Sequence, residues 1–314
     1  MKYAAIGSVI TNKILYTDGS TVEDIMGGVV YAAEGLRLWQ DEVGFVSNVG
    51  EDFDKYYGQW MKDNDFSYEG IKVKAKRCSY TCVEYHPDGT WHEYTIYDDP
   101  DHQGPSLGIV STTPDDLTDE VCQNLRCMNI EAGLNEAMLT KARQMGDKYG
   151  FKVMWEISTS KCKPENLEKI KELCKLVDSF SINGPETCEL FGVSTDEECI
   201  EKLKTLNVPF ILFRVGTKGL YSIADGKSYF VPCRRYDGTP MDPTGCGNSS
   251  TATGGMAFAE GYHPLMCGIM ANLTAHYNVR QFGPVLNMTK ELREEMWAAA
   301  NEEFARLSKE YGVE

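Results

Sequence analysis

The sequence predicts an α/β protein with a mainly parallel sheet that helices cover on both faces. Apolar, strand-like runs alternate with helix-like segments over most of the 314 residues, and parallel strands need such crossover helices. No internal repeat, low-complexity segment or linker interrupts this alternation. We therefore expect a single α/β domain over residues 1–314.

The first elements of this pattern lie near the amino end of the sequence. Two short apolar runs, KYAAIGSV and VGFVSNVG, are typical of buried strands. Between them, VVYAAEGLRLW follows Gly27 and Gly28 and predicts a buried helix. The chain therefore opens as strand, helix, strand.

Further pairs of strand and helix follow along the chain. The strand-like run RCMNIEAG precedes LNEAMLTKARQMGDKYG, in which Met138, Ala142 and Met145 share one helical face. Next comes the strand FKVMWEIS, and then PENLEKIKELCKLV, whose proline suits the first turn of a helix. A buried strand, VPFILFRVG, precedes two more expected helices, NSSTATGGMAFAEGY and residues 289–307.

One region departs from the alternation of strands and helices. Residues 70–97 alternate polar and apolar side chains around HPDGTW, a turn signal typical of a hairpin. We expect two or more antiparallel strands inserted into the α/β pattern. Such a sheet could close over a ligand, pair two copies of the chain, or only extend the edge of the main sheet.

The composition narrows the classes of partner. The net charge is −16 and the sequence pI is about 4.8, which argues against nucleic acid or an anionic membrane surface, because both need clustered Lys and Arg. A small anionic ligand remains compatible, since helix N-termini supply local positive potential. No apolar run is long enough for a signal peptide or a membrane span, so a soluble, cytoplasmic protein is expected.

The stretch DPTGCGNSS, from Asp242 to Ser250, is the most informative motif. Its run Gly245-Cys246-Gly247 precedes an expected helix. Glycines let main-chain N–H groups approach a ligand closely, and the helix dipole favours negative charge there. The motif predicts an anion hole.

Two other segments follow strands at their carboxyl ends, where open α/β sheets bind ligands. RVGTKGLYSI offers Gly216, Thr217 and Gly219 to a polyphosphate, although a turn between two strands explains these glycines equally well. FSINGPETCELFG places Asn183 and Glu186 three residues apart at a helix start. They could orient metal-bound water, since Mg²⁺ keeps several waters, or they could simply cap the helix.

In their order and spacing, these segments resemble the ribokinase/PfkB family of sugar kinases over most of the chain. GGVVYAAEGLRLW with VGFVSNVGEDF is similar to the family's di-glycine signature, and SINGPETCELFG to its N-x-x-E motif. VGTKG resembles the nucleotide-binding G-x-x-G, and DPTGCGN the D-T-x-G-A-G-D signature. MANLTAHYNVRQFGP occupies the place of the segment that flanks the adenine.

The resemblance implies a three-layer αβα ribokinase-like fold with a small β-sheet lid over the sugar, here approximately residues 11–24 and 70–108. It also implies the cofactors ATP and Mg²⁺, a small-molecule sugar or nucleoside substrate, and the possibility of a homodimer through the lid.

Roles for individual residues follow from the same resemblance. The catalytic positions are Gly245, Cys246 and Gly247 in the anion hole and Asn248 in the place of the general base. The nucleotide positions are Asn183, Glu186, Thr217, Gly219, Asp242, Thr244, Asn272 and His276, with Glu186 also reaching Mg²⁺ through water. The substrate positions are Asn12, Gly27, Gly28 and Tyr31.

Three residues depart from the family pattern. The last Asp of the signature is the family's base, and Asn248 stands in its place; a carboxamide cannot accept a hydroxyl proton as a carboxylate does. At the sugar site, Asn12 stands where members often carry Asp, and Tyr31 where many carry Asn. Losing two carboxylates would relieve repulsion against an anionic ligand.

Two functions therefore stay open. The first is an ATP-dependent phosphotransferase acting on a hydroxyl of a sugar, sugar acid or nucleoside, with Asn248 replacing the usual base. The second is a catalytically impaired ligand-binding or regulatory protein on the same scaffold. A Rossmann dehydrogenase is disfavoured, because no G-x-G-x-x-G follows the first strand.

Overall fold

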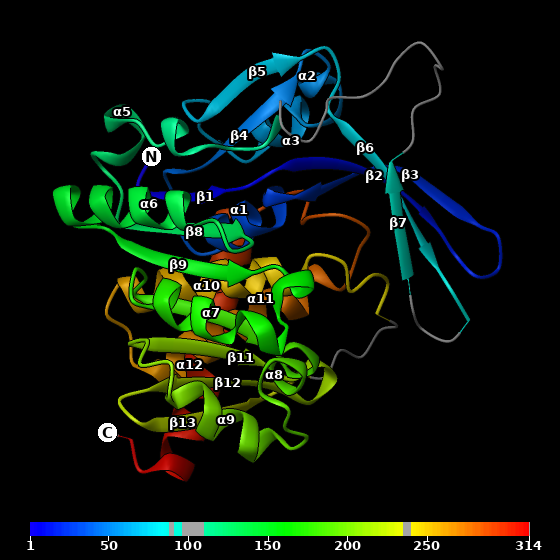
Figure 1. Cartoon of the computed structure of the whole chain (residues 1–314). Coiled ribbons are helices and arrows are strands. Elements are labelled where there is room, and N and C mark those ends of the chain that lie inside the picture. Colours follow the sequence, from blue (N-terminus) through cyan, green and yellow to red (C-terminus); the bar gives the residue numbers. More distant parts are fainter. Residues whose placement is uncertain (88–90, 96–109, 235–239, 314) are drawn as a thin grey trace.

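A large, mainly parallel sheet forms the centre of the molecule (Figure 1). The computed structural model describes residues 1–87, 91–95, 110–234 and 240–313. Within them the sheet has nine strands in the order β13-β12-β11-β10-β9-β8-β1-β4-β5. Their bounds are β1 Tyr3–Ile6, β4 Val43–Gly50, β5 Ile71–Ala75, β8 Cys127–Ala132, β9 Lys152–Ile157, β10 Ser179–Asn183, β11 Phe210–Arg214, β12 Gly219–Ala224 and β13 Lys227–Pro232.

The strands from β5 to β11 pair in parallel, and β12 and β13 continue the sheet antiparallel. The central strands are almost continuously buried, as expected for parallel strands with both faces covered. Because they run in one direction, β1, β8, β9, β10 and β11 end at the same edge of the sheet. This carboxyl edge is where such sheets bind ligands.

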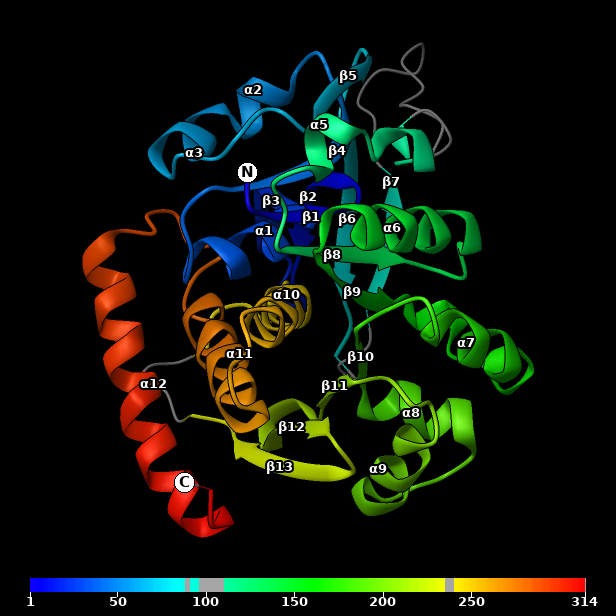
Figure 2. The ribbon, with the colours of Figure 1, turned by 90° about the vertical axis from the view of Figure 1, so that its left-hand side faces the viewer.

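Helices cover both faces of the large sheet and form two outer layers (Figure 2). One face carries α5 Asp119–Cys122, α6 Glu136–Tyr149, α7 Leu167–Cys174, α8 Gly184–Phe191 and α9 Asp196–Lys204. The other carries α1 Val29–Arg37, α2 Phe53–Tyr56, α3 Gly58–Asp63, α10 Cys246–Ala259, α11 Pro264–Asn278 and α12 Lys290–Tyr311. Each face has its own hydrophobic core. The expected three-layer αβα architecture is confirmed.

Small residues let α10 approach its neighbours closely, which fixes where this helix begins. A Cβ added at Gly35 of α1 would lie 2.1 Å from the carbonyl oxygen of Ser249. A Cβ at Gly255 would lie 2.6 Å from the side chain of Met154 on β9. Since α10 is locked between α1 and the sheet, its N-terminus is held at the carboxyl edge.

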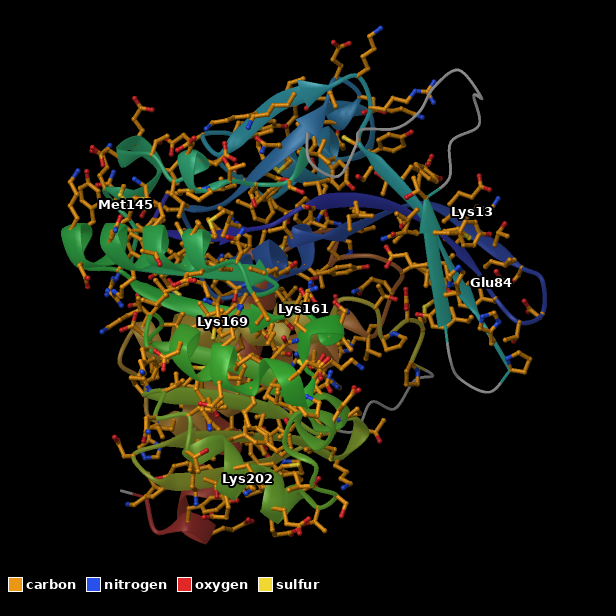
Figure 3. All side chains as sticks on the ribbon, viewed as in Figure 1. Lys13, Glu84, Met145, Lys161, Lys169 and Lys202 are labelled. Atoms are coloured by element: carbon orange, nitrogen blue, oxygen red, sulfur yellow. The ribbon has the colours of Figure 1, made fainter. Side chains whose placement is uncertain are left out.

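A second, smaller sheet stands beside the large one (Figure 1). Its strand order is β3-β2-β6-β7, with bounds β2 Val9–Leu15, β3 Thr21–Gly28, β6 Ser79–Tyr85 and β7 Trp91–Thr95. In Figure 3, Lys13 on β2 and Glu84 on β6 show where this sheet lies. It is well apart from α7 and α9, which carry Lys169 and Lys202. The expected hairpin strands are therefore present as β6 and β7, which pair antiparallel.

The small sheet differs in extent from the lid that the sequence predicts. The expected segment 70–108 includes β5, but β5 pairs in parallel with β4 at the edge of the large sheet. Alternating polar and apolar residues are common to any strand with one open face, so the sequence pattern could not separate β5 from β6. Residues 88–90 and 96–108 of that segment lie outside the described residues.

Among the described residues, no helix combines the length and apolar character needed to cross a membrane.

Candidate functional site

The turn that precedes α10 is tightly organised by its own side chains. Asp242 is buried, and its Oδ1 accepts hydrogen bonds from the Thr244 backbone N–H (2.9 Å) and hydroxyl (2.6 Å). Asn278 of α11 donates from Nδ2 to the Thr244 carbonyl at 2.8 Å. Gly245 then caps α10 in the left-handed region at φ 83°. The turn therefore presents the N-terminal amides of α10 at the carboxyl edge of the sheet.

Both glycines of the turn have close side-chain neighbours. A Cβ at Gly245 would lie 2.1 Å from the ring of Tyr31, and a Cβ at Gly247 would lie 2.2 Å from Nη1 of Arg214. Tyr31 is buried on α1, and Arg214 ends β11. The turn is thus packed between an aromatic ring and a guanidinium group, at a helix N-terminus of the kind that favours anions.

Cys246 is held inside this turn as an ordinary thiol. Its Sγ lies 3.5 Å from the Ala275 carbonyl and accepts from Nδ2 of Asn278 at 3.3 Å. Burial raises the pKa of this thiol to about 11. Residue 246 is therefore not expected to act as a thiolate, and its backbone N–H is engaged by the Pro243 carbonyl at 3.2 Å.

Asn248 is the third residue of α10 and contacts a carboxylate. Its Nδ2 donates to Oε1 of Glu131 at 2.8 Å, and Glu131 stands at the end of β8. The position at which the sequence resemblance expects a base thus holds an amide paired with a neighbouring carboxylate. Sequence reasoning missed Glu131.

A second carboxylate stands beside Glu131 because the strands are in register. Glu131 of β8 pairs with Glu156 of β9 in the parallel ladder, so both side chains lie on the same face of the sheet. Glu156 forms a salt bridge with Arg214, with Oε1 2.9 Å from Nη2. Both side chains of this salt bridge are largely buried, at 10% and 16% exposure.

Burial and neighbouring carboxylates make these two carboxyl groups weaker acids than ordinary glutamates. Burial, and next the charge of Glu156, raise the pKa of Glu131 to about 8, against the hydrogen bond from Asn248 and the charge of Arg214. Burial also raises the pKa of Glu156, opposed mainly by Arg214. The carboxyl edge therefore carries a group that exchanges protons near neutral pH.

Asn183 and Glu186 form a capping box at the start of α8. The Asn183 side chain accepts from the Glu186 backbone N–H at 3.0 Å, and Oε2 of Glu186 accepts from the Asn183 backbone N–H at 2.9 Å. Oε1 of Glu186 accepts from the Thr159 hydroxyl at 2.6 Å. The capping role left open by the sequence is present. Each oxygen retains a second lone pair for another donor.

The glycines around Thr217 serve the connection between β11 and β12. Residues Gly216–Lys218 form a 3-10 turn, and Gly219 begins β12 with φ 132°. A Cβ at Gly219 would lie 2.1 Å from the Val231 carbonyl on β13. The turn between two strands, which the sequence left as an alternative, is present here, and its glycine follows from backbone packing.

Asn272 and His276 lie on α11 and make contacts within the protein. Asn272 donates from Nδ2 to the carbonyls of Val231 and Pro232, at 3.1 and 2.9 Å, and so ties α11 to the end of β13. His276 is buried and hydrogen-bonds Arg280 one turn later. The side chains of both residues are thus engaged within the protein, Asn272 with the end of β13 and His276 within α11 and the residues that follow it.

The expected substrate residues cluster where the small sheet meets α1. Asn12 is buried on β2, and its Oδ1 accepts from the Thr81 hydroxyl at 2.7 Å. A Cβ at Gly27 would lie 2.1 Å from Nδ2 of Asn12, and Gly28 caps α1. Tyr31 follows in the first turn of α1, and its ring packs against Gly245, so α1 joins this cluster to the turn before α10.

One contact links the small sheet directly to the turn. The hydroxyl of Tyr85, at the end of β6, lies 3.1 Å from Oγ1 of Thr244. Because Thr244 donates its only proton to Asp242, Tyr85 is the donor. The ring of Tyr85 also stacks on Tyr16. Sequence reasoning missed this residue.

The two missed carboxylates share a faint signal in the sequence. Glu131 and Glu156 are single charged residues near the carboxyl ends of otherwise apolar strand-like runs, NIEAG and MWEIS. A charge at such a position is seldom buried without a function or a partner. Their contact, however, depends on the register of β8 and β9.

Comparisons with known proteins agree with this geometry. An adenosine kinase structure from Sinorhizobium meliloti matches with a TM-score of 0.75 at 15% identity, covering 94% of this chain and 99% of that one. A ribokinase II candidate from E. coli, in complex with ATP and Mg²⁺, matches with a TM-score of 0.75 at 16% identity, covering 96% and 99%. These similarities show the ribokinase-like fold.

Comparisons of the sequence alone give two further similarities. An uncharacterized protein of Schizosaccharomyces pombe is 20% identical, over 90% of this chain and 85% of its own length. The model of the pfkB family of carbohydrate kinases matches residues 2–291. That match spans both sheets, the capping box of α8 and the turn before α10, and the chain belongs to the PfkB family of carbohydrate kinases.

Proposed function

We propose that the protein transfers the γ-phosphate of ATP to a hydroxyl group of a sugar, a sugar acid or a nucleoside. The observation that carries this proposal is the Asp242–Gly247 turn, which presents the N-terminus of α10 at the carboxyl edge of a parallel sheet. Membership of a carbohydrate kinase family supports it, as does the fold shared with an adenosine kinase.

The turn would supply most of the catalytic stabilisation. In phosphoryl transfer, negative charge spreads over the oxygens of the moving phosphoryl group, and fixed donors at that point lower the barrier most. The backbone amides of Gly245 and Gly247 would be such donors, whereas the Cys246 N–H already donates to the Pro243 carbonyl at 3.2 Å. Arg214, which is paired with Glu156, lies beside them. Their geometry is set before a ligand binds, because Tyr31 and Asp242 hold the turn.

Nucleotide binding would involve the loops around this turn. Oδ2 of Asp242 has no hydrogen-bond partner among the described residues, although it is buried, so it can accept from a ligand or face a cation. We assign the remaining nucleotide contacts, as proposals, to Thr244, Asn183, Thr217, Gly219, Asn272 and His276.

Magnesium fits the residues that are present. Among the described residues, no group of three or more His, Cys, Asp or Glu could hold a metal by itself. Mg²⁺ in nucleotide sites is held mainly by phosphate oxygens and water, so Glu186 would contact it through a water molecule. When bound with the nucleotide, the ion would neutralise charge on the phosphates.

The acceptor would bind between the small sheet and the turn. We assign Asn12, Gly27 and Gly28 to this pocket, with Tyr31 supporting it from below. The small sheet would act as a lid, and its contact from Tyr85 to Thr244 supports this role. A homodimer through the small sheet and a cytoplasmic location remain predictions.

One observation favours a second function, that of a ligand-binding protein with little transfer. Asn248 cannot take a proton at neutral pH, and a positioned base contributes about 10²–10⁴-fold to such reactions. The turn before α10 and the capping box of α8, by contrast, keep the residues that the resemblance assigns to nucleotide binding.

Turnover and binding measured together separate the two functions. The purified protein is incubated with ATP, Mg²⁺ and a panel of sugars, sugar acids and nucleosides, and ADP and phosphorylated product are quantified. We expect ADP to form in stoichiometric amounts with one phosphorylated acceptor class. Calorimetric ATP binding without product from any acceptor would contradict the proposal and assign the binding function.

A further inference from the structure

We propose that Glu131 accepts the proton of the substrate hydroxyl during transfer, and that Asn248 positions Glu131. The inference rests on the proposed kinase function and deepens it by naming the group that replaces the missing base. It is carried by the hydrogen bond from Nδ2 of Asn248 to Oε1 of Glu131, at 2.8 Å.

The contact places a carboxylate beside the anion-binding amides. Asn248 directly follows Gly247, so its partner Glu131 lies next to the N-terminus of α10. A Cβ added at Gly7, where β1 ends, would lie 3.4 Å from Oε2 of Glu131. Glu131 is half-buried and stands between β1, β9 and α10. Its position is therefore fixed from several sides.

The surroundings of Glu131 suit a proton acceptor. Glu156 faces it from β9, Arg214 lies beyond Glu156 on β11, and Glu186 acts on Glu156 from α8. Burial and the charge of Glu156 raise the pKa of Glu131 to about 8. A carboxylate with a pKa near the working pH is a stronger base than an ordinary one.

The step balances without any further reactant besides ATP. The hydroxyl O–H bond breaks and its proton moves to Glu131, while the hydroxyl oxygen forms a bond to the γ-phosphorus. The bond from that phosphorus to the β,γ-bridging oxygen breaks, and its electron pair leaves with ADP. Glu131 returns its proton to solvent after product release.

The pair also explains why an amide occupies position 248. An Asp there would bring a second carboxylate against Glu131, and two carboxylates in contact cannot both ionise near neutral pH. Asn248 instead donates to Glu131 and favours its charged form. Asn248→Asp is therefore not expected to restore a stronger kinase, and it should raise the pKa of the pair.

The test compares three variants in steady-state transfer over a range of pH. In the wild type, kcat/KM should rise with pH through a midpoint near 8 and level off above it, following the ionisation of Glu131. Glu131→Gln should lower kcat about 10²–10⁴-fold while ATP affinity measured by calorimetry changes little. Glu131→Asp keeps a carboxylate and should recover part of the rate. Asn248→Asp should move the acidic limb of the pH profile, in which kcat/KM rises with pH, to higher pH.

Two control variants bracket this effect. Glu136→Gln changes an exposed glutamate at the start of α6, only five residues away, and should leave rate and pH profile as in the wild type. Glu156→Gln removes the neighbouring charge that raises the pKa of Glu131, so the acidic limb should shift to lower pH.

A readout independent of activity is the pH dependence of stability. Because the pKa of Glu131 is raised in the folded state, the folded wild type loses stability as pH rises from the ordinary glutamate pKa through about 8. Glu131→Gln should flatten this decline in the melting temperature, and Glu136→Gln should not.

The outcomes separate this inference from the proposed function. Transfer by Glu131→Gln at the wild-type rate, with an unchanged acidic limb, would overturn the role of Glu131 and leave the kinase function standing. A large gain by Asn248→Asp at neutral pH would do the same. Absence of transfer by the wild type, with ATP bound, would overturn the kinase function and the role of Glu131 with it.

Discussion

Two glycine turns stand at the carboxyl edge of the sheet, and they need glycine for different reasons. In the turn before β12, a Cβ at Gly219 would meet the backbone of β13, 2.1 Å from the Val231 carbonyl. In the turn before α10, a Cβ at Gly245 or Gly247 would meet the side chains of Tyr31 and Arg214. The first turn connects β11 to β12, and the second precedes the first residue of α10.

The difference shows how one sequence signature can serve two physical purposes. A glycine that is packed against backbone keeps a sheet together. A glycine that leaves room for a ring and a guanidinium group shapes a surface at a helix N-terminus, where anions bind. Substitutions in the two turns should therefore separate stability from transfer.

The largest effect is expected for Gly245→Ala. Its methyl group would collide with the Tyr31 ring and strain a residue at φ 83°, so the amides of the turn would move. Loss of one well-placed donor costs about 10²–10³-fold in kcat. Steady-state transfer and ATP calorimetry measure both consequences.

The matched control is Gly226→Ala, in the connection between β12 and β13. Gly226 also has positive φ, at 72°, but a Cβ there would meet nothing within 4 Å. It carries the conformational strain without the collision and should affect stability alone. Equal losses of kcat in the two variants would show that strain, and not the shape of the turn, sets the rate.

Arg214→Met should give the next largest effect, and chiefly on stability. It leaves Glu156 buried without its cation, and breaking a buried ion pair by removing one partner costs about 3–5 kcal/mol. Urea unfolding measures the change. The double variant Arg214→Met/Glu156→Met should recover most of the loss; no recovery would mean that Arg214 stabilises the fold through other contacts.

Gly219→Ala should lower mainly the folding stability, whereas Gly245→Ala should lower mainly kcat. Its methyl group would press on the β13 backbone, and residue 219 would be strained at its φ of 132°. Such strain costs about 1–3 kcal/mol of folding stability. At a temperature where both variants are folded, its loss of kcat should be smaller than that of Gly245→Ala. A larger loss would place the turn before β12 at the reacting phosphate.

The sequence predicts those features of the fold and of the site that depend on residues close together in the chain. The alternation of strands and helices is local, and so is the Asp242–Gly247 turn; both are predicted correctly. The contact of Glu131 with Asn248 joins residues 117 positions apart and depends on strand register, so no local pattern shows it. The assignment of β5 failed for the same reason, since its partner in the sheet decides it.

Tyr85→Phe should give the smallest effect and tests the link between the small sheet and the turn. Tyr85 donates one hydrogen bond to Thr244, and such a bond contributes about 0.5–1.5 kcal/mol. The stacking on Tyr16 is preserved in phenylalanine. If the small sheet closes over the acceptor, weaker closure should raise the KM for the acceptor up to about 10-fold, with kcat nearly constant. A fall in kcat at constant KM would instead mean that Tyr85 holds the turn itself, because only a displaced anion hole would slow transfer without weakening binding.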